Sequence, residues 1–288
     1  MSALGIRAGY RRRVRFRGAN NLVLVLCGVV LAAIAVCVVL GSVIAPQDPN
    51  AVNLQIALQG PSLAHLFGTD ATGRDIFSRV LAGARPSILG PILIAVGATG
   101  LGTLIGVAAA WKRGVSDALL SRGMEILFAF PGLLMAMMAV AILGRGLTAP
   151  VVALTIANTP WVARIIRSVA LRERSLPYVA ALTVQGFSGF TICVRHVLPN
   201  ISRTIWAQLA LTFTYGMTDL LAINFLGLGV QPPTPDWGVL VNEGQDSILQ
   251  GAPWETLFAS VFIVLTIVAA TALSARLGEE QTSVRGRA

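Results

Sequence analysis

Long apolar stretches dominate the pattern of hydrophobic and polar positions, and short polar segments separate them. A helix that spans a membrane needs about 20 mostly apolar residues. Pro131 and Pro160 lie inside two of the stretches and are expected to kink their helices. The pattern predicts an all-α, polytopic membrane protein with about six transmembrane helices. They are expected at residues 21–45, 85–111, 122–143, 147–168, 203–229 and 255–276.

Composition points to the same class of protein. Hydrophobic residues make up 55% of the 288 residues, and charged residues make up 12%. Because soluble proteins carry about 25% charged residues, this chain has too few to cover a surface that faces water. The first apolar stretch is much longer than the apolar region of a cleaved signal peptide and is interpreted as a membrane anchor.

Basic residues predict the orientation in the membrane. The formal net charge is +9, nearly all of it from arginine, and Lys112 is the single lysine. Loops that carry Lys and Arg stay in the cytoplasm. Both termini and the arginine-containing loop at 172–200 are therefore expected in the cytoplasm, and the acidic loop near 230–254 outside. Topology explains the positive charge, so membrane lipid and not nucleic acid is the expected partner.

The spans divide the chain into four parts. We expect a basic cytoplasmic tail at residues 1–20, followed by the first transmembrane helix and an outer loop at 21–84. Residues 85–276 form the core with five helices and the cytoplasmic loop at 172–200. A second cytoplasmic tail follows at 277–288.

The loop at 172–200 contains a segment with the composition of a docking element. Tyr178 to Gln185 is predicted to form a short helix of small and apolar residues. Gly186 is expected to end it, because glycine adopts a positive φ without steric cost. A basic segment with Arg195 and His196 follows, and Leu198-Pro199 is expected to close it. An apolar helix on the cytoplasmic side is expected to be covered by another subunit.

Four segments carry a resemblance to a known family. They are FGTDATGRDIFSRVLAGARPSI at 67–88, MEILFAFPGLL at 124–134, WVARIIRSVALRERSLPYVAAL at 161–182 and INFLGLGVQPPTPDWGVLVNEG at 223–244. Together with the docking segment they resemble the dipeptide/oligopeptide/nickel permeases of ABC importers, specifically the C-type subunit. The resemblance implies a type I ABC importer permease fold in a bacterial plasma membrane. The arginine-rich, lysine-poor composition favours an actinobacterial source.

The resemblance implies partners and a mechanism. A second homologous permease subunit, ATPase subunits that hold ATP and Mg, and an extracytoplasmic peptide-binding protein are expected, and import proceeds by alternating access. The loop is expected to couple the permease to the ATPase through Tyr178, Val179, Ala181, Gly186, Arg195, His196, Leu198 and Pro199. The family usually has a glutamate where this chain has Ala180, so docking is expected to rely more on packing, with basic residues around Arg195 as support.

The chain itself is not expected to be an enzyme. The nucleotide-binding motif requires a lysine after glycine, whereas Lys112 follows Trp111. His65 and His196 lie far apart, and no Cys/His cluster has the spacing of metal ligands. No cofactor, metal or catalytic residue is therefore assigned to this chain.

Asp219 is the most costly residue within the predicted spans. A carboxylate near the centre of a transmembrane helix costs about 2.5–3.5 kcal/mol, so it is expected to face a partner or a water-filled path. With Thr218 and Asn224 it forms the candidate translocation path. Contact between helices is an equally good interpretation of these residues.

The function predicted from these observations is import of dipeptides or oligopeptides as one permease subunit of an ABC transporter. The same family also handles nickel or nickel chelates, which is the close alternative. An ion-coupled secondary transporter, with Asp219 as the ion or proton site, is the alternative from another class.

Overall fold

The computed structural model describes residues 17–111 and 115–285, and helices account for every regular element within them. The long helices are α1 (Arg17–Ile44), α2 (Ile76–Trp111), α3 (Val115–Phe128), α4 (Gly132–Leu143), α5 (Thr148–Arg174), α8 (Leu198–Phe225) and α11 (Trp254–Arg285). The short ones are η1 (Leu54–Ile56), α6 (Pro177–Val184), α7 (Gly189–Ile192), the π-helical η2 (Cys193–Val197), α9 (Trp237–Glu243) and α10 (Gln245–Leu249).

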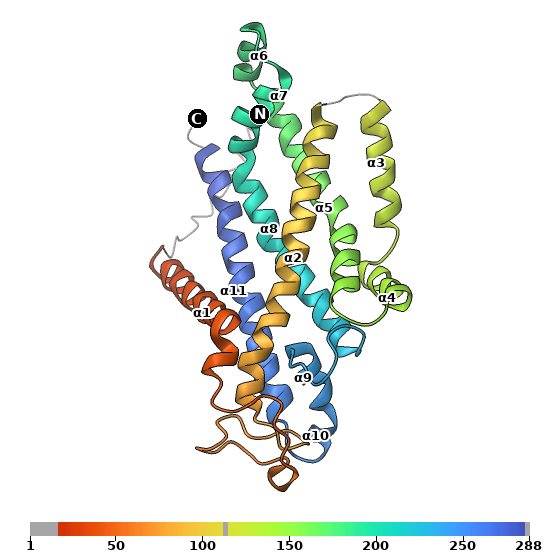
Figure 1. The fold of residues 1–288 in the computed structure, drawn as a ribbon. Coiled ribbons are helices and arrows are strands. Elements are labelled where there is room, and N and C mark those ends of the chain that lie inside the picture. Colours follow the sequence, from red (N-terminus) through yellow and green to blue (C-terminus); the bar gives the residue numbers. More distant parts are fainter. Residues whose placement is uncertain (1–16, 112–114, 286–288) are drawn as a thin grey trace, which may run out of the picture.

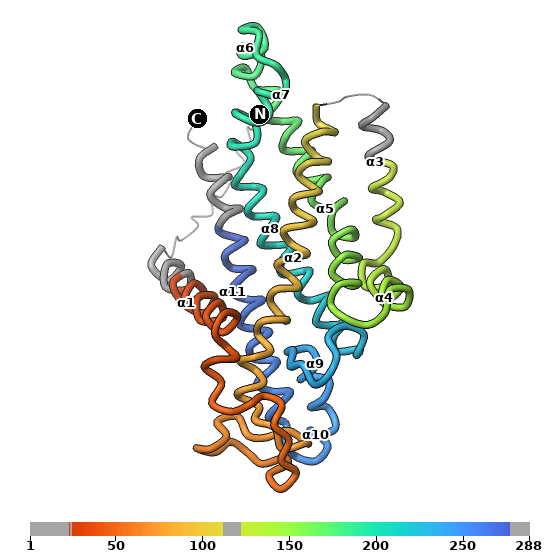
Figure 2. The backbone as a smooth tube through the Cα atoms, in the orientation of Figure 1, coloured from red at the N-terminus to blue at the C-terminus, as the bar shows by residue number. Residues whose placement is uncertain are grey.

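The long helices form a bundle with a distinct structure at each end (Figure 1). Helices α2, α5, α8 and α11 make the centre, while α1 and the α3–α4 pair lie at its sides. Helices α6 and α7 project from one end, and α9, α10 and the loop before α2 cover the other. We call these the α6 end and the α10 end. Figure 2 follows the chain between them.

Helix length and composition support most of the predicted spans. By these criteria α1, α2, α5 and α11 are long and apolar enough to cross a membrane. A fifth span results if the bent pair α3–α4 counts as one. Helix α8 is also long, with 28 residues, but is less apolar than these four. The predicted number of six transmembrane helices therefore stays a prediction.

Several helices differ in extent from the predicted spans. Helix α2 begins at Ile76, ahead of the span predicted from residue 85, and α8 begins at Leu198, ahead of the span predicted from residue 203. The third predicted helix is not continuous, because its halves meet at an angle of 83° just before α4. Pro131 lies at this bend and lacks the N–H that a continuous helix would need. Pro160, in contrast, lies within α5 without ending it.

Two glycines let α2 approach α5 closely. A Cβ at Gly102 would lie 2.6 Å from Cβ of Val162, and one at Gly106 would lie 2.6 Å from the carbonyl oxygen of Ala163. Larger residues at these two positions would push the helices apart. The glycines thus perform the packing role that small residues have between membrane helices.

Buried polar contacts fasten the α10 end to α2. The Trp237 side chain is fully buried, and its indole N–H donates to the carbonyl oxygen of Val80 at 2.9 Å. Asp236 caps α9 by accepting from the N–H of Gly238 at 2.8 Å, and the Ser87 hydroxyl donates to it at 2.6 Å. Burial raises the pKa of Asp236 above its ordinary value, although these hydrogen bonds oppose the shift.

A buried ionic cluster lies beside these contacts. Arg79 on α2 is fully buried and donates to Glu243 on α9 at 2.5 Å. Arg74 donates to the same carboxylate at 3.2 Å and to Asp70 at 2.5 Å, while Glu255 lies 3.8 Å from Nε of Arg79. Removing one partner from such a buried cluster would leave an uncompensated charge. The cluster thus ties the loop before α2, α2 itself, α9 and α11 together.

Candidate functional site

The candidate site is the segment at the α6 end, residues 173–200, which we call the α6 module. Its first helix, α6, starts with Pro177 at the first helical position, where the missing N–H has no cost. The preceding Leu176 is extended (ψ 147°), as expected before proline. The chain therefore leaves α5 sharply, and α6 does not continue the long helix.

Gly186 ends α6 as predicted. It has a φ of +85°, which suits glycine. Its N–H donates to the carbonyl oxygen of Thr183 at 3.0 Å, and the N–H of Phe187 donates to the carbonyl oxygen of Leu182 at 3.2 Å. This pair of bonds is the Schellman motif, which satisfies the last carbonyl groups of a helix.

The second half of the module differs from the prediction. Leu198-Pro199 does not close the basic segment, because α7, η2 and α8 follow one another without an intervening turn. Ser188 caps α7 by accepting from the N–H of Thr191 at 3.2 Å. Pro199 lies in the first turn of α8, a position that tolerates proline. The module therefore passes directly into a long helix of the bundle.

Glu173, at the end of α5, connects α5 with both α6 and α8. Glu173 is 6% exposed, and its carboxylate accepts from the Tyr178 hydroxyl at 2.9 Å and from the Asn200 amide at 3.0 Å. The same amide donates to the Tyr178 oxygen at 3.2 Å. Burial, together with the hydrogen bond and negative charge of Glu173, raises the pKa of Tyr178, so the phenol keeps its proton and remains a donor.

Arg174, the next residue, connects α5 with the end of α2. One guanidinium nitrogen donates to the carbonyl oxygens of Ala110 and Trp111 at 2.7 and 3.0 Å. These last carbonyls of α2 have no partner within their own helix, and a positive charge is favourable there. The guanidinium also lies 5.1 Å from the centre of the Trp111 ring. A Cβ at Gly189 would lie 2.5 Å from Nε1 of Trp111, so α7 packs directly against this ring.

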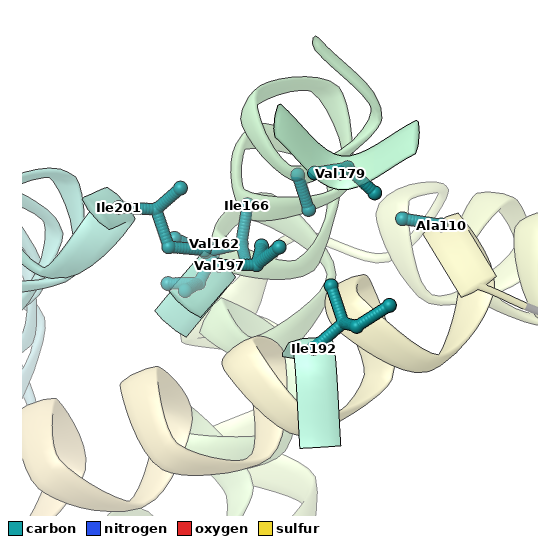
Figure 3. Close-up of a cluster of buried hydrophobic side chains, with 8 residues drawn as sticks. Ala110, Val162, Ile166, Val179, Ile192, Val197 and Ile201 are labelled. Atoms are coloured by element: carbon teal, nitrogen blue, oxygen red, sulfur yellow. The ribbon is translucent and has the colours of Figure 1, made fainter. Parts of the chain in front are cut away.

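An apolar cluster supports these polar contacts (Figure 3). Val179 of α6 and Ile192 of α7 are almost fully buried in it, as are residues from the three long helices. Tyr178, Leu182 and Leu198 pack at its edge. The members are Ala110, Val162, Ile166, Ala170, Val179, Ile192, Val197 and Ile201. The module is thus attached to α2, α5 and α8 by both packing and hydrogen bonds.

The surface of the module exposes several apolar side chains. Val184 is 89% exposed and Phe190 is 79% exposed. Ala180, Ala181 and Arg195 are also exposed, and no described part of the chain covers this surface. Exposed apolar side chains on a projecting element are typical of a protein–protein contact.

The predicted docking residues all lie in the α6 module, but Val179 is buried in the apolar cluster and is not available to a partner. The predicted path residues differ in their surroundings. Asp219 is half-buried and Thr218 is exposed on α8. Asn224 is 1% exposed, and its side chain donates to Asp236 at 2.9 Å and accepts from the N–H of Val230 at 3.1 Å. The Asn224 amide is therefore engaged in the contacts of the α10 end and does not line an open path in this structure.

Four residues that organise the module escaped the sequence analysis: Trp111, Glu173, Arg174 and Gly189. Arg174 and its carbonyl partners are more than 60 positions apart, with separations of 64 and 63. The sequence offers only a short pattern that could have pointed to them: an acidic and a basic residue precede Ser-Leu-Pro at the end of an apolar helix. That pattern indicates a helix end but not the elements it contacts.

The chain was compared with known proteins. Residues 102–279, which include the whole α6 module, match the family model described as "Binding-protein-dependent transport system inner membrane component". The chain is 40% identical over 259 residues to a putative peptide transport system permease protein of Brucella abortus, covering 90% of this chain and 85% of the relative. It is 39% identical over 211 residues to a dipeptide transport system permease protein of Alkalihalophilus pseudofirmus, covering 73% and 69%. A glutathione transport system permease protein of Pectobacterium atrosepticum is 37% identical over 211 residues, covering 73% and 70%.

The contacts of Arg174 lead to a prediction about the α6 module. Replacing Arg174 with alanine removes a charged donor whose hydrogen bonds are each worth about 1.5–3 kcal/mol. The amides of residues 178–187 should then exchange with solvent roughly tenfold faster, because local opening becomes easier. Hydrogen exchange read by mass spectrometry measures this.

Arg172→Ala provides the matched control, because Arg172 is an exposed arginine in the same helical turn. It should leave exchange in the module unchanged. Equal exchange in the Arg174→Ala and wild-type proteins would show that Arg174 does not hold the module.

Proposed function

We propose that this chain, which belongs to the family of binding-protein-dependent transport system inner membrane components, is a permease subunit of an ATP-driven importer of dipeptides and oligopeptides. The observation that carries the proposal is the 40% identity to a peptide transport permease across 90% of the chain. Relatives with "dipeptide" and "glutathione" in their names support the same substrate class, since glutathione is itself a small peptide.

A permease of this kind would work with separate subunits that bind and hydrolyse ATP. We place the contact with the ATPase on the exposed surface of the α6 module, which includes Val184, Phe190 and Ala180. Docking by packing fits this apolar surface, and Arg195 adds a positive charge beside it. A second permease subunit would complete the path, and a peptide-binding protein would deliver substrate at the α10 end.

The attachment of the module suggests how ATP binding would act on the bundle. ATP must favour one global state over another to shift the equilibrium between them. Movement of a docked α6 would reach α2 through Arg174, and α8 through Glu173 and Asn200. The module would therefore transmit motion of the ATPase to two long helices together.

Uptake of a labelled dipeptide tests the proposed substrate class. Cells without this gene should lose ATP-dependent uptake, and the intact gene should restore it. Excess nickel should not compete. The measurement belongs in a strain without other peptide importers.

Unchanged dipeptide uptake after deletion would contradict the proposal. Competition by nickel would favour the nickel alternative. An energised uptake that needs no ATPase partner would favour the ion-coupled transporter.

Ala180 offers a test of how the module docks. Ala180→Glu restores the family's usual glutamate and should tighten binding of the ATPase roughly two- to fivefold, the range for an exposed ion pair. The gain should disappear at high salt. Affinity of the purified permease complex for its ATPase, measured at two salt concentrations, gives the answer.

Ala181→Glu adds the same charge to the neighbouring exposed position of α6 and should give no such gain. If Ala180→Glu leaves both affinity and salt sensitivity unchanged, an electrostatic contact at this position is excluded and docking depends on packing alone.

A further inference from the structure

Helix α8 has a polar face that the rest of the described chain leaves open. Five described helices have 18 or more residues. Four of them are apolar enough to cross a membrane, and α8 is the less apolar fifth. Its opposite face is buried, with Met217 and Leu220 at 1% exposure or less. Tyr215 is 53% exposed, and Thr218 one turn further is also exposed. The polar residues that lower the hydropathy of α8 thus lie partly on its uncovered side.

Asp219 lies on this face with no partner of its own. In the part of the chain that the structure describes, its carboxylate makes no hydrogen bond and no ion pair. The neighbouring hydroxyls do not serve it, since Thr218 donates to the carbonyl oxygen of Thr214 at 3.0 Å within the same helix. Thr214 in turn donates to the carbonyl oxygen of Ala210 at 3.2 Å. The one acidic group of this helix face is therefore available to a group from outside the chain.

The surroundings of Asp219 leave room beside it. The bend between α3 and α4 places the start of α4 next to α8, and a Cβ at Gly132 would lie 4.0 Å from Oδ2 of Asp219. Glycine at this position keeps a side chain away from the carboxylate. Pro131 provides no side-chain cap for α4, and the positive end of a helix stabilises a nearby negative charge. Asp219 thus lies half-buried beside the start of α4, and its carboxylate has no partner in the described part of the chain.

We infer that Asp219 is a substrate-recognition residue of the translocation path, which accepts the protonated α-amino group of a peptide in transit. An ionisable group among membrane helices is stable only where it faces a partner or water. A carboxylate binds an ammonium group through short charge-assisted hydrogen bonds. Peptides with a free N-terminus carry such a group, and the Tyr215 ring one turn away offers a surface that also favours cations. This inference rests on the proposed peptide function.

Reactivity of an introduced thiol tests the charge at this site without peptide transport. In a chain whose three cysteines are replaced by serine, Thr218→Cys places a thiol beside Asp219. A cationic methanethiosulfonate reagent should react faster than an anionic one in the assembled transporter. Adding Asp219→Asn should lower this preference roughly tenfold, the effect of losing about 1.4 kcal/mol of interaction.

Glu125→Gln is the control, because it removes an exposed carboxylate from α3 and should not alter the preference. No reaction at position 218 with either reagent would show that this face meets lipid or protein, which would overturn the inference. A preference that persists with Asp219→Asn would overturn it as well.

Transport by the reconstituted complex then tests recognition itself. With saturating dipeptide-loaded binding protein, Asp219→Asn should reduce the dipeptide imported per ATP hydrolysed roughly tenfold, while Asp219→Glu retains most of it. An unchanged ratio in Asp219→Asn would contradict the inference and show that Asp219 has no role in transport. Release of the second permease subunit would also contradict it and identify Asp219 as a contact between subunits. Absence of dipeptide import by the wild-type complex, with the charge preference intact, would instead mark failure of the proposed peptide function.

Discussion

Two consecutive residues at the end of α5 hold the whole α6 end in place. Glu173 binds Tyr178 of α6 and Asn200 of α8, and Arg174 binds the last carbonyls of α2. In each contact a charged side chain forms a hydrogen bond with an uncharged polar group. The charge makes such a bond stronger than one between two uncharged groups. Three helices and the projecting module therefore meet at a single turn, and the apolar cluster beneath it excludes water from their junction.

Helix α2 extends this constraint through the length of the molecule. At the α6 end, Arg174 and Gly189 fix Trp111. At the α10 end, Trp237 and the Arg79 cluster fix the first turns of the same helix. Between them, Gly102 and Gly106 bring its backbone against α5. Because α2 is held at both ends and along its middle, displacement of the module is expected to reach the other long helices through α2.

The sequence was sufficient for features that depend on local chemistry. Apolar stretches predicted the long helices, and the family resemblance was confirmed by relatives across most of the chain. The end of α6 at Gly186 was predictable because glycine can adopt a positive φ without steric cost, independently of distant contacts. The Arg79 cluster was not predicted, since Arg79 and Glu243 are 164 positions apart. Asn224 was grouped with Asp219 because both are polar in one helix, but its partner Asp236 approaches only after the loop folds back.

If the α6 module is attached rigidly to α2, the distance between them stays the same when ATP binds. Spin labels at Gln185, at the end of α6, and at Leu101 of α2, both exposed, would report their separation in the assembled transporter with and without trapped ATP. This pair of labels should give one narrow distance distribution that is the same in both states. A broad distribution, or one that shifts when ATP is trapped, would contradict the account and show that the module moves independently of the bundle.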